Sequence, residues 1–288
     1  MIVPGASRVR TFPFITLLLP IFAHSSCLAG SIPEQLPHDV CLSFPQVNKG
    51  QAELWARSDM LSESSSYSKA LFSSEFAETV PCCSKRSPPE HAPNADTAPV
   101  EKDSEDSDDD TDEFILSIRP SRSEELSVDL PAKPLVITQS AYSTYSALLV
   151  YLQSDFIEFC PLTSSFPSSS HPTRSTFITT KHTTEPSLPL PVSPKSMYRL
   201  ADLLDLPGVK RLSLEAFRSS LSLKNAAQAF FSDTSLAYDE LHGVILDFIK
   251  ANCSEVKAGG AWKEKMREIE AGELPEGAPV VVKLLSWL

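Results

Sequence analysis

Cysteine and histidine are the side chains best suited to metal binding or nucleophilic chemistry, and their spacing in this sequence builds no such site. Cys82 and Cys83 are adjacent, and His91 follows them. A tetrahedral metal site needs four converging ligands, and this stretch does not supply the others. The cysteines also form no C-x-x-C pair and no regular framework of the kind that zinc-binding or disulfide-rich domains show. We therefore expect no metal and no other cofactor.

The histidines do not lie in a catalytic motif either. An enzyme needs acid, base or nucleophilic side chains that converge in a pocket. Three of the six histidines fall in stretches of low complexity, and no glycine-rich loop that could hold a phosphate is present. The sequence thus predicts a chain that is not an enzyme and has no catalytic residues. The six are His24, His38, His91, His171, His182 and His242.

The charge of the chain argues against nucleic acid as a partner. The formal net charge is -12, whereas proteins that bind nucleic acid use basic patches that displace its counterions. Much of the negative charge lies in the run SEDSDDDTDE, where Ser107 directly precedes Asp108, Asp109 and Asp110. This acidic context makes Ser107 the candidate phosphorylation site.

Residues 1–35 form an N-terminal apolar segment with more than one interpretation. Arg8 and Arg10 precede the run TFPFITLLLPIFA, and small residues follow it, which is the order of a secretory signal. The run is shorter than the roughly 20 residues that a membrane-spanning helix needs, and Pro13 and Pro20 interrupt it. We expect no membrane partner. A buried strand or a remnant of a preceding domain is the preferred interpretation, and secretion is the minority one.

Two segments have the composition of insertions. Residues 81–112 are rich in proline and end in the acidic run, where like charges repel and little apolar area is available, which predicts a disordered insertion with a regulatory role. Residues 163–191 mix Ser, Thr and Pro without a helical period, which predicts a loop or linker. We expect deletion of residues 84–112 to change the free energy of unfolding by no more than about 1 kcal/mol.

The remaining blocks predict ordered elements. VCLSF and AELWA predict a two-stranded hairpin, KPLVIT a buried strand, AYSTYSALLVYLQS an amphipathic helix, and DFIEF a further strand. Ser193 and Pro194 predict the start of a helix, Pro207 starts the next one, and Gly272 ends the last. The longest apolar stripe at helical spacing consists of Leu241, Val244, Ile245, Phe248 and Ile249.

In chain order these blocks run strand, strand, helix pair, strand, helix, strand, helix pair and further helices. The order resembles the BTB/POZ domain, in particular the BTB-domain proteins abundant in basidiomycete fungi. The resemblance covers about residues 36 to 285 without the insertions, and it implies an α+β fold. A small mixed sheet flanked by helices would span residues 36–222, and an all-α, BACK-like extension would span residues 223–288. The blocks that carry it are PHDVCLSFP, AELWARSDMLSESSSYSKALFSSEFAET, ITQSAYSTYSALLVYLQSDFIEFCPL and SPKSMYRLADLLDLPGVKRLSLEAFRSSL.

The resemblance implies a protein–protein interaction module that forms a homodimer. The family's cullin contact uses a hydrophobic-x-Glu motif after the first helix pair, and Phe76-Ala77-Glu78 holds that position. These residues imply a substrate adaptor of a cullin-RING ubiquitin ligase, with a cullin scaffold as a second partner. The alternative is a dimeric scaffold or regulatory protein without ligase activity, because a Phe at a helix end is usually core and an exposed Glu is usually just solvated. The adaptor function requires a cytoplasmic or nuclear chain.

Overall fold

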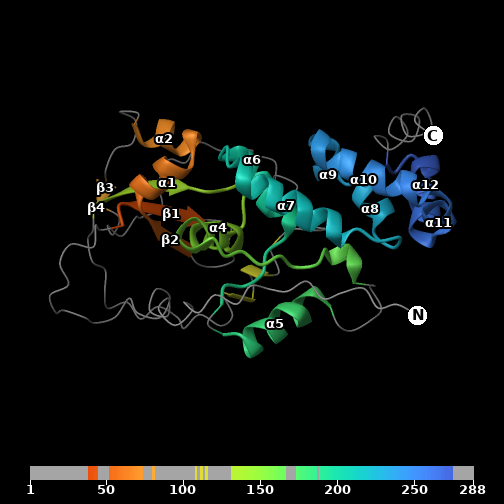
Figure 1. Ribbon diagram of the computed structural model, residues 1–288, viewed down its shortest axis with the longest axis horizontal. Coiled ribbons are helices and arrows are strands. Elements are labelled where there is room, and N and C mark those ends of the chain that lie inside the picture. The colour runs from red at the N-terminus through yellow and green to blue at the C-terminus, as the bar shows by residue number, and fades with distance from the viewer. Residues whose placement is uncertain are drawn as a thin grey trace, which may run out of the picture. The chain divides into compact units, whose positions relative to one another are not determined.

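The computed structural model describes residues 38–44, 52–73, 80–81, 108, 111–112, 114–115, 131–166, 173–186 and 188–274. Strands and helices mix along the chain, which confirms the α+β class (Figure 1). None of the described helices has the length and apolarity needed to span a bilayer. The elements are β1 (Val40–Phe44), β2 (Ala52–Ala56), α1 (Ser58–Ser64), α2 (Ser66–Ser73), β3 (Val80–Pro81), β4 (Pro131–Val136), α4 (Tyr142–Ser154), η2 (Thr163–Ser165), α5 (Arg174–Thr184), α6 (Pro194–Leu203), α7 (Pro207–Ser220), α8 (Ala226–Phe230), α9 (Asp233–Ala237), α10 (Asp239–Ala251), α11 (Cys253–Ala258) and α12 (Gly260–Ala271).

The strands of the described residues form one mixed sheet in the order β2-β1-β4-β3. β1 and β2 form the predicted antiparallel hairpin, in which Val40 lies opposite Ala56. β1 also pairs in parallel with β4, with Val40 opposite Lys133, and β4 pairs antiparallel with β3. Parallel neighbours need a crossover connection, and the α1–α2 helix pair is part of that connection.

One face of the sheet forms the first hydrophobic core. Val40, Leu42 and Phe44 alternate along β1 toward this face and are buried. The ring of Phe44 meets Tyr142 and Tyr145 of α4 edge-on, with centroids 5.5 and 5.7 Å apart. The predicted helix α4 therefore covers this face of the sheet, beside β1 and β2 in Figure 1.

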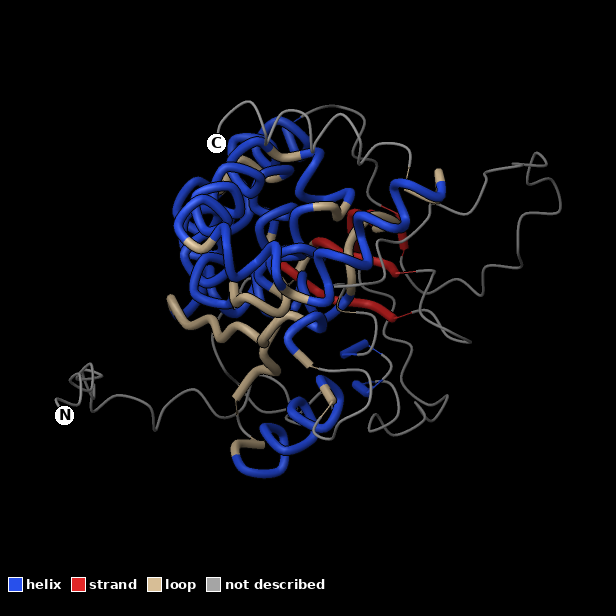
Figure 2. Tube along the Cα trace, turned by 90° about the vertical axis from the view of Figure 1, so that its right-hand side faces the viewer, coloured by secondary structure: helices blue, strands red, loops and turns tan. Residues whose placement is uncertain are grey.

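A second hydrophobic core lies among the helices from α7 to α12, which Figure 2 shows packed against one another. The ring of Phe230 lies tilted against that of Trp262 of α12, with centroids 6.3 Å apart. Leu162 and Tyr198 precede residue 222 in the chain, yet they belong to this same core. Packing thus continues across the predicted domain boundary between residues 222 and 223.

The predicted capping residues are confirmed at three helix ends. Ser193 is the N-cap of α6 and accepts a hydrogen bond from the amide of Ser196, while Pro194 is in the first turn. Pro207 begins α7. Gly272 ends α12 with φ at 75°, a left-handed conformation that favours glycine.

The prediction that residues 163–191 form a loop or linker was wrong, because they contain η2 and α5. The hydroxyl oxygen of Thr173 caps α5 by accepting a hydrogen bond from the amide of Thr176 at 3.3 Å. Threonine is a weak helix former, so composition hid this helix. Tertiary packing decides instead, since Ile178 is fully buried. The predicted strand at DFIEF is reduced to a single bridge between Phe159 and Val192.

The prediction that residues 81–112 are a disordered insertion was wrong at its end. Asp108, Thr111 and Asp112 are buried, and the amide of Asp112 donates to the carbonyl of Asp108 at 2.9 Å. The described residues of the acidic run therefore pack into the fold. Residues 82–107 lie outside the described residues.

Candidate functional site

The residues predicted to bind partners lie in connections that the structure does not describe. α2 ends at Ser73 and β3 begins at Val80, so Phe76 and Glu78 fall in the connection between them and outside the described residues. Ser107 also lies outside the described residues, although its neighbour Asp108 is described.

The cysteine and histidine cluster considered as a metal site lies outside the described residues too. It consists of Cys82, Cys83 and His91. Within the ranges that the structure describes, no group of three or more His, Cys, Asp or Glu side chains could hold a metal ion.

The start of α1 is fixed by a carboxylate that precedes β1. Asp39 accepts hydrogen bonds from the amide of Ser58 at 2.7 Å and from its hydroxyl at 2.5 Å. These bonds satisfy a donor that the first helical turn leaves without an intrahelical acceptor. The α1–α2 pair is therefore held to the sheet at its first residue.

The same helix pair is held at its middle to the turn between α6 and α7. The hydroxyl of Ser65 donates to the carbonyl of Leu204 at 2.5 Å, and the hydroxyl of Ser66 donates to the carboxylate of Asp205 at 2.5 Å. Asp205 has φ at 53°, in the left-handed region. One side of the helix pair is thus anchored to the fold.

The other side of α2 carries apolar side chains toward solvent. Tyr67 is 45% exposed, and Ala70 and Leu71 follow it at the i+3 and i+4 positions, exposed and half-buried. We name these three residues the α2 stripe. Phe72 points into the first core instead, where the ammonium of Lys133 lies 5.6 Å from its ring centroid.

The second feature is a buried carboxylate, Asp108, bound by the starts of three helices. Asp108 accepts hydrogen bonds from Nη2 of Arg174 at 2.5 Å and from the hydroxyl of Thr144 at 2.7 Å. It also accepts from the amide of Ser193 at 2.8 Å. Arg174 begins α5, Thr144 lies in the first turn of α4, and Ser193 is the N-cap of α6. One side chain from the acidic run thus joins three separate helices.

Asp112 caps α4 from a distant part of the chain. Its carboxylate accepts from the amides of Tyr142 and Ser143, both at 2.8 Å, across sequence separations of 30 and 31 residues. The N-cap residue Ala141 has no side-chain oxygen and makes no cap bond of its own. A carboxylate at a helix start also interacts favourably with the helix dipole. We name Asp108, Thr111 and Asp112 the acidic clasp.

The groups that bind the two carboxylates form a built anion site, which we name the receiving site. Burial raises the pKa of the Asp108 carboxyl, and the charge of Arg174 opposes that rise. Burial likewise raises the pKa of Asp112, and the hydrogen bonds from Ser143 oppose it. Burying a charge is costly unless donors replace its water, and these donors offset part of that cost. The receiving site consists of the Arg174 guanidinium, the Thr144 hydroxyl and the amides of Tyr142, Ser143 and Ser193.

The sequence analysis missed this site, although one signal for it was present. Asp108 and Asp112 are four residues apart, a spacing that puts two side chains on the same face of a helical turn. The sequence analysis instead predicted disorder for the acidic run, because its like charges repel one another. Its cationic partner, Arg174, lies 66 residues away, and no local pattern connects the two.

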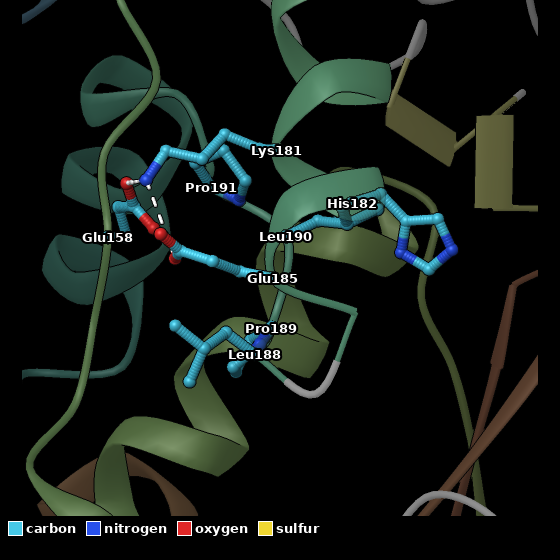
Figure 3. Close-up of a pocket in the computed structure, with 8 residues that line it drawn as sticks. All are labelled: Glu158, Lys181, His182, Glu185, Leu188, Pro189, Leu190 and Pro191. Atoms are coloured by element: carbon cyan, nitrogen blue, oxygen red, sulfur yellow. Dashed lines mark ion pairs between the residues drawn. The ribbon is translucent and has the colours of Figure 1, made fainter.

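A shallow hollow of about 180 Å³ lies beside α5 (Figure 3). Lys181 points toward Glu158 and Glu185 there, with Nζ 2.6 and 3.6 Å from their carboxylate oxygens, while His182 points away. The hydrogen bond to Glu158 raises the pKa of Lys181, which keeps the ammonium charged. The hollow is smaller than the roughly 300–1,000 Å³ of typical ligand pockets, and we assign it no catalytic role.

A charged cluster joins α6, α7 and α10. Nζ of Lys210 lies 2.8 Å from Asp202 and 3.1 Å from Glu240, whose other oxygen accepts from the hydroxyl of Tyr198 at 3.1 Å. The hydrogen bond to Asp202 is the main cause that raises the pKa of Lys210. Since Asp202 and Lys210 precede residue 223 and Glu240 follows it, this cluster connects the two predicted domains.

Three features of the described residues are therefore candidates for function: the α2 stripe, the acidic clasp in its receiving site, and the charged cluster around Lys210. The α2 stripe is open to solvent. The clasp carboxylates are buried and accept hydrogen bonds from the receiving site, and the charges around Lys210 form ion pairs with one another. No protein-family model matches the chain, and no curated protein matches it. The function therefore has to be inferred from the residues of the chain itself.

Proposed function

We propose that this chain is a protein–protein interaction module of the BTB/POZ type that forms a homodimer through the α1–α2 pair. The α2 stripe is the observation that carries the proposal. Tyr67 is exposed on a helix pair whose opposite side is anchored by Ser65 and Ser66. An aromatic side chain on a rigid support is a common anchor of protein interfaces.

The order and pairing of the elements support the family assignment. The β1–β2 hairpin, the α1–α2 pair, the parallel pairing of β4 with β1 and the α6–α7 pair follow one another as the resemblance implies. The helices after α7 are in the place of the BACK-like extension. An interaction module of this kind needs no catalytic residue, metal or other cofactor.

The cullin-RING adaptor is the second candidate, and it is supported by the resemblance. Phe76 and Glu78 follow the first helix pair in the sequence, which is where the resemblance implies the cullin contact. Without that contact the protein would be a dimeric scaffold. Both candidates share the homodimer and differ only in the cullin.

Ser107 is the proposed regulatory residue. A phosphate there would lie next to Asp108 in the sequence, whose carboxylate is buried against Arg174. The added negative charge would repel that carboxylate and compete for the guanidinium. Phosphorylation at Ser107 would therefore weaken the docking of the acidic clasp.

Two measurements on the same sample test the proposal. Light scattering at micromolar concentration should give the mass of a dimer, and a monomer would contradict the homodimer. Retention of a cullin by the immobilised chain would support the adaptor, and Glu78→Ala should then weaken it by about 1–3 kcal/mol. Glu63→Ala, an exposed glutamate on α1, is the matched control. If the chain retains no cullin under conditions where a known adaptor does, the adaptor function is contradicted and the dimeric scaffold is the function that remains.

A further inference from the structure

The receiving site has the chemistry of a peptide-binding site, and its present ligand is part of the same chain. Every hydrogen bond to the two clasp carboxylates given above comes from α4, from Arg174 or from Ser193. In the ligand, the amide of Asp112 donates to the carbonyl of Asp108, a bond between residues i+4 and i. The main feature that the receiving site recognises is therefore a pair of aspartates four residues apart.

The forces that hold the acidic clasp are those of a reversible contact. An ion pair that is 2% and 0% exposed loses much of its Coulomb attraction to desolvation. The apolar side chains next to the clasp add partial contacts, since Ile115 is partly buried against the first core and the ring of Phe114 meets that of His182 edge-on. Polar docking of this kind is sensitive to competing charged ligands.

The fit of the clasp is also incomplete. The hydroxyl of Thr111 is buried, and it has no hydrogen-bond partner. A buried hydroxyl without a partner costs free energy, whereas an apolar group of the same shape would not. A ligand with valine at the position of Thr111 should therefore bind better than the chain's own segment.

We propose that the receiving site is a docking site for acidic peptides that carry aspartates at i and i+4 and a β-branched apolar residue at i+3. In the structure, Asp108 and Asp112 occupy it as an intramolecular ligand. An acidic partner protein gains access by displacing the clasp. Because the clasp is part of the chain, it is present at an effective concentration that a free peptide must exceed. The site is separate from the α2 stripe, so it does not depend on the homodimer.

The test uses the full chain with protease sites inserted at residues 95–100 and 120–125, cleaved after folding so that the clasp is held only by its contacts. The probe is a labelled synthetic peptide that copies residues 105–116, EDSDDDTDEFIL. We expect the peptide to replace the cleaved segment, and to enter the uncut chain at least about tenfold less well. The version with Thr111→Val should compete about fivefold better. The version with Asp108→Asn and Asp112→Asn should not compete.

Each outcome of this experiment either supports or contradicts the docking site. Failure of the peptide to enter the folded, cleaved chain contradicts it, and so does equal competition by the three peptides. If cleavage unfolds the chain, restoration of the fold by excess peptide supports docking, and failure to restore it contradicts docking. The mass from light scattering is measured separately, so failure of this proposal and failure of the homodimer are distinguishable.

Discussion

Arg174 and Asp108 form an ion pair in the interior of the protein, with Nη2 2.5 Å from the carboxylate oxygen and both side chains buried. Asp108→Asn removes the negative partner and leaves a guanidinium without compensation. We expect the free energy of unfolding to fall by about 3–5 kcal/mol. Urea denaturation followed by circular dichroism measures this loss.

The exposed ion pair between Arg57 and Asp59 is the matched control, since these side chains are 41% and 46% exposed. Arg57→Gln should leave the free energy of unfolding almost unchanged, because solvent screens an exposed ion pair. Replacing both buried partners, with Asp108→Leu and Arg174→Met, should recover part of the loss. If Asp108→Asn proves as mild as Arg57→Gln, the pair is not buried in solution.

Two nested deletions separate the acidic clasp from the chain before it. Deletion of residues 84–106 leaves Asp108 and Asp112 in place, and we expect a change of no more than about 1 kcal/mol in the free energy of unfolding. Deletion of residues 84–112 also removes the clasp, exposes the start of α4 and leaves Arg174 without its partner. That deletion should cost at least about 3 kcal/mol.

The loss expected for the second deletion is larger than the one expected from composition, which assigned little contribution to stability to all of residues 84–112. Thermal unfolding of the two variants under identical conditions gives the comparison. Equal melting temperatures would show that the clasp adds nothing to stability and would remove its structural role.

Two aspartates among the described residues adopt left-handed backbone conformations, and the carboxylate of one of them, Asp205, accepts a side-chain hydrogen bond that accounts for an aspartate there. Asp155 follows α4 with φ at 55°, and Asp155→Gly should raise stability by about 0.5–1 kcal/mol because glycine adopts this conformation without strain. Asp205, at φ 53°, accepts the hydrogen bond from Ser66. Asp205→Gly should therefore gain nothing or lose stability. A gain of equal size in both variants would contradict the role of the Ser66 bond.

Tyr145 should make the fold sensitive to alkali. Burial, and secondarily the charge of Tyr67, raise the pKa of Tyr145 to about 12 from an ordinary value of 10.0. The unfolded phenol ionises first, so stability is complete below pH 10 and is lost as the pH rises from about 10 to about 12. Across this pH interval, we expect the free energy of unfolding of Tyr145→Phe to fall by about 2 kcal/mol less than that of wild type.

Unfolding midpoints in urea at pH 8 and pH 11 measure the first part of this difference, about 1.4 kcal/mol. Tyr151→Phe, at a half-buried position of the same helix, controls for the loss of a phenol hydroxyl. A parallel decline of wild type and Tyr145→Phe between the two pH values would argue against a buried phenol at residue 145.

The fold was predictable where local periodicity and capping decide the structure. The alternation of Val40, Leu42 and Phe44 predicted β1, and the stripe that includes Ile245 predicted α10. It was not predictable where packing overrides composition. Residues 174–184 are rich in threonine, and their helix depends on the burial of Ile178.

The candidate site was less predictable than the fold, because its partners are far apart in the chain. Asp108 and Arg174 meet only after α4, α5 and α6 have assembled. A run of like charges predicts repulsion when its surroundings are water. Here the starts of helices and a guanidinium replace the water for two of its carboxylates, and composition contains no information about that replacement.

We propose that two copies of the chain form a homodimer through the α2 stripe. The most direct measurement is light scattering of residues 33–288 at micromolar concentration, for wild type, Tyr67→Glu and Leu223→Glu. Leu223 is 44% exposed, like Tyr67, but lies in the turn between α7 and α8. We expect wild type and Leu223→Glu to be dimers and Tyr67→Glu to be a folded monomer, because a charge cannot be buried in an apolar interface without a partner. A monomeric wild type, or a Tyr67→Glu variant that stays dimeric, would contradict the claim.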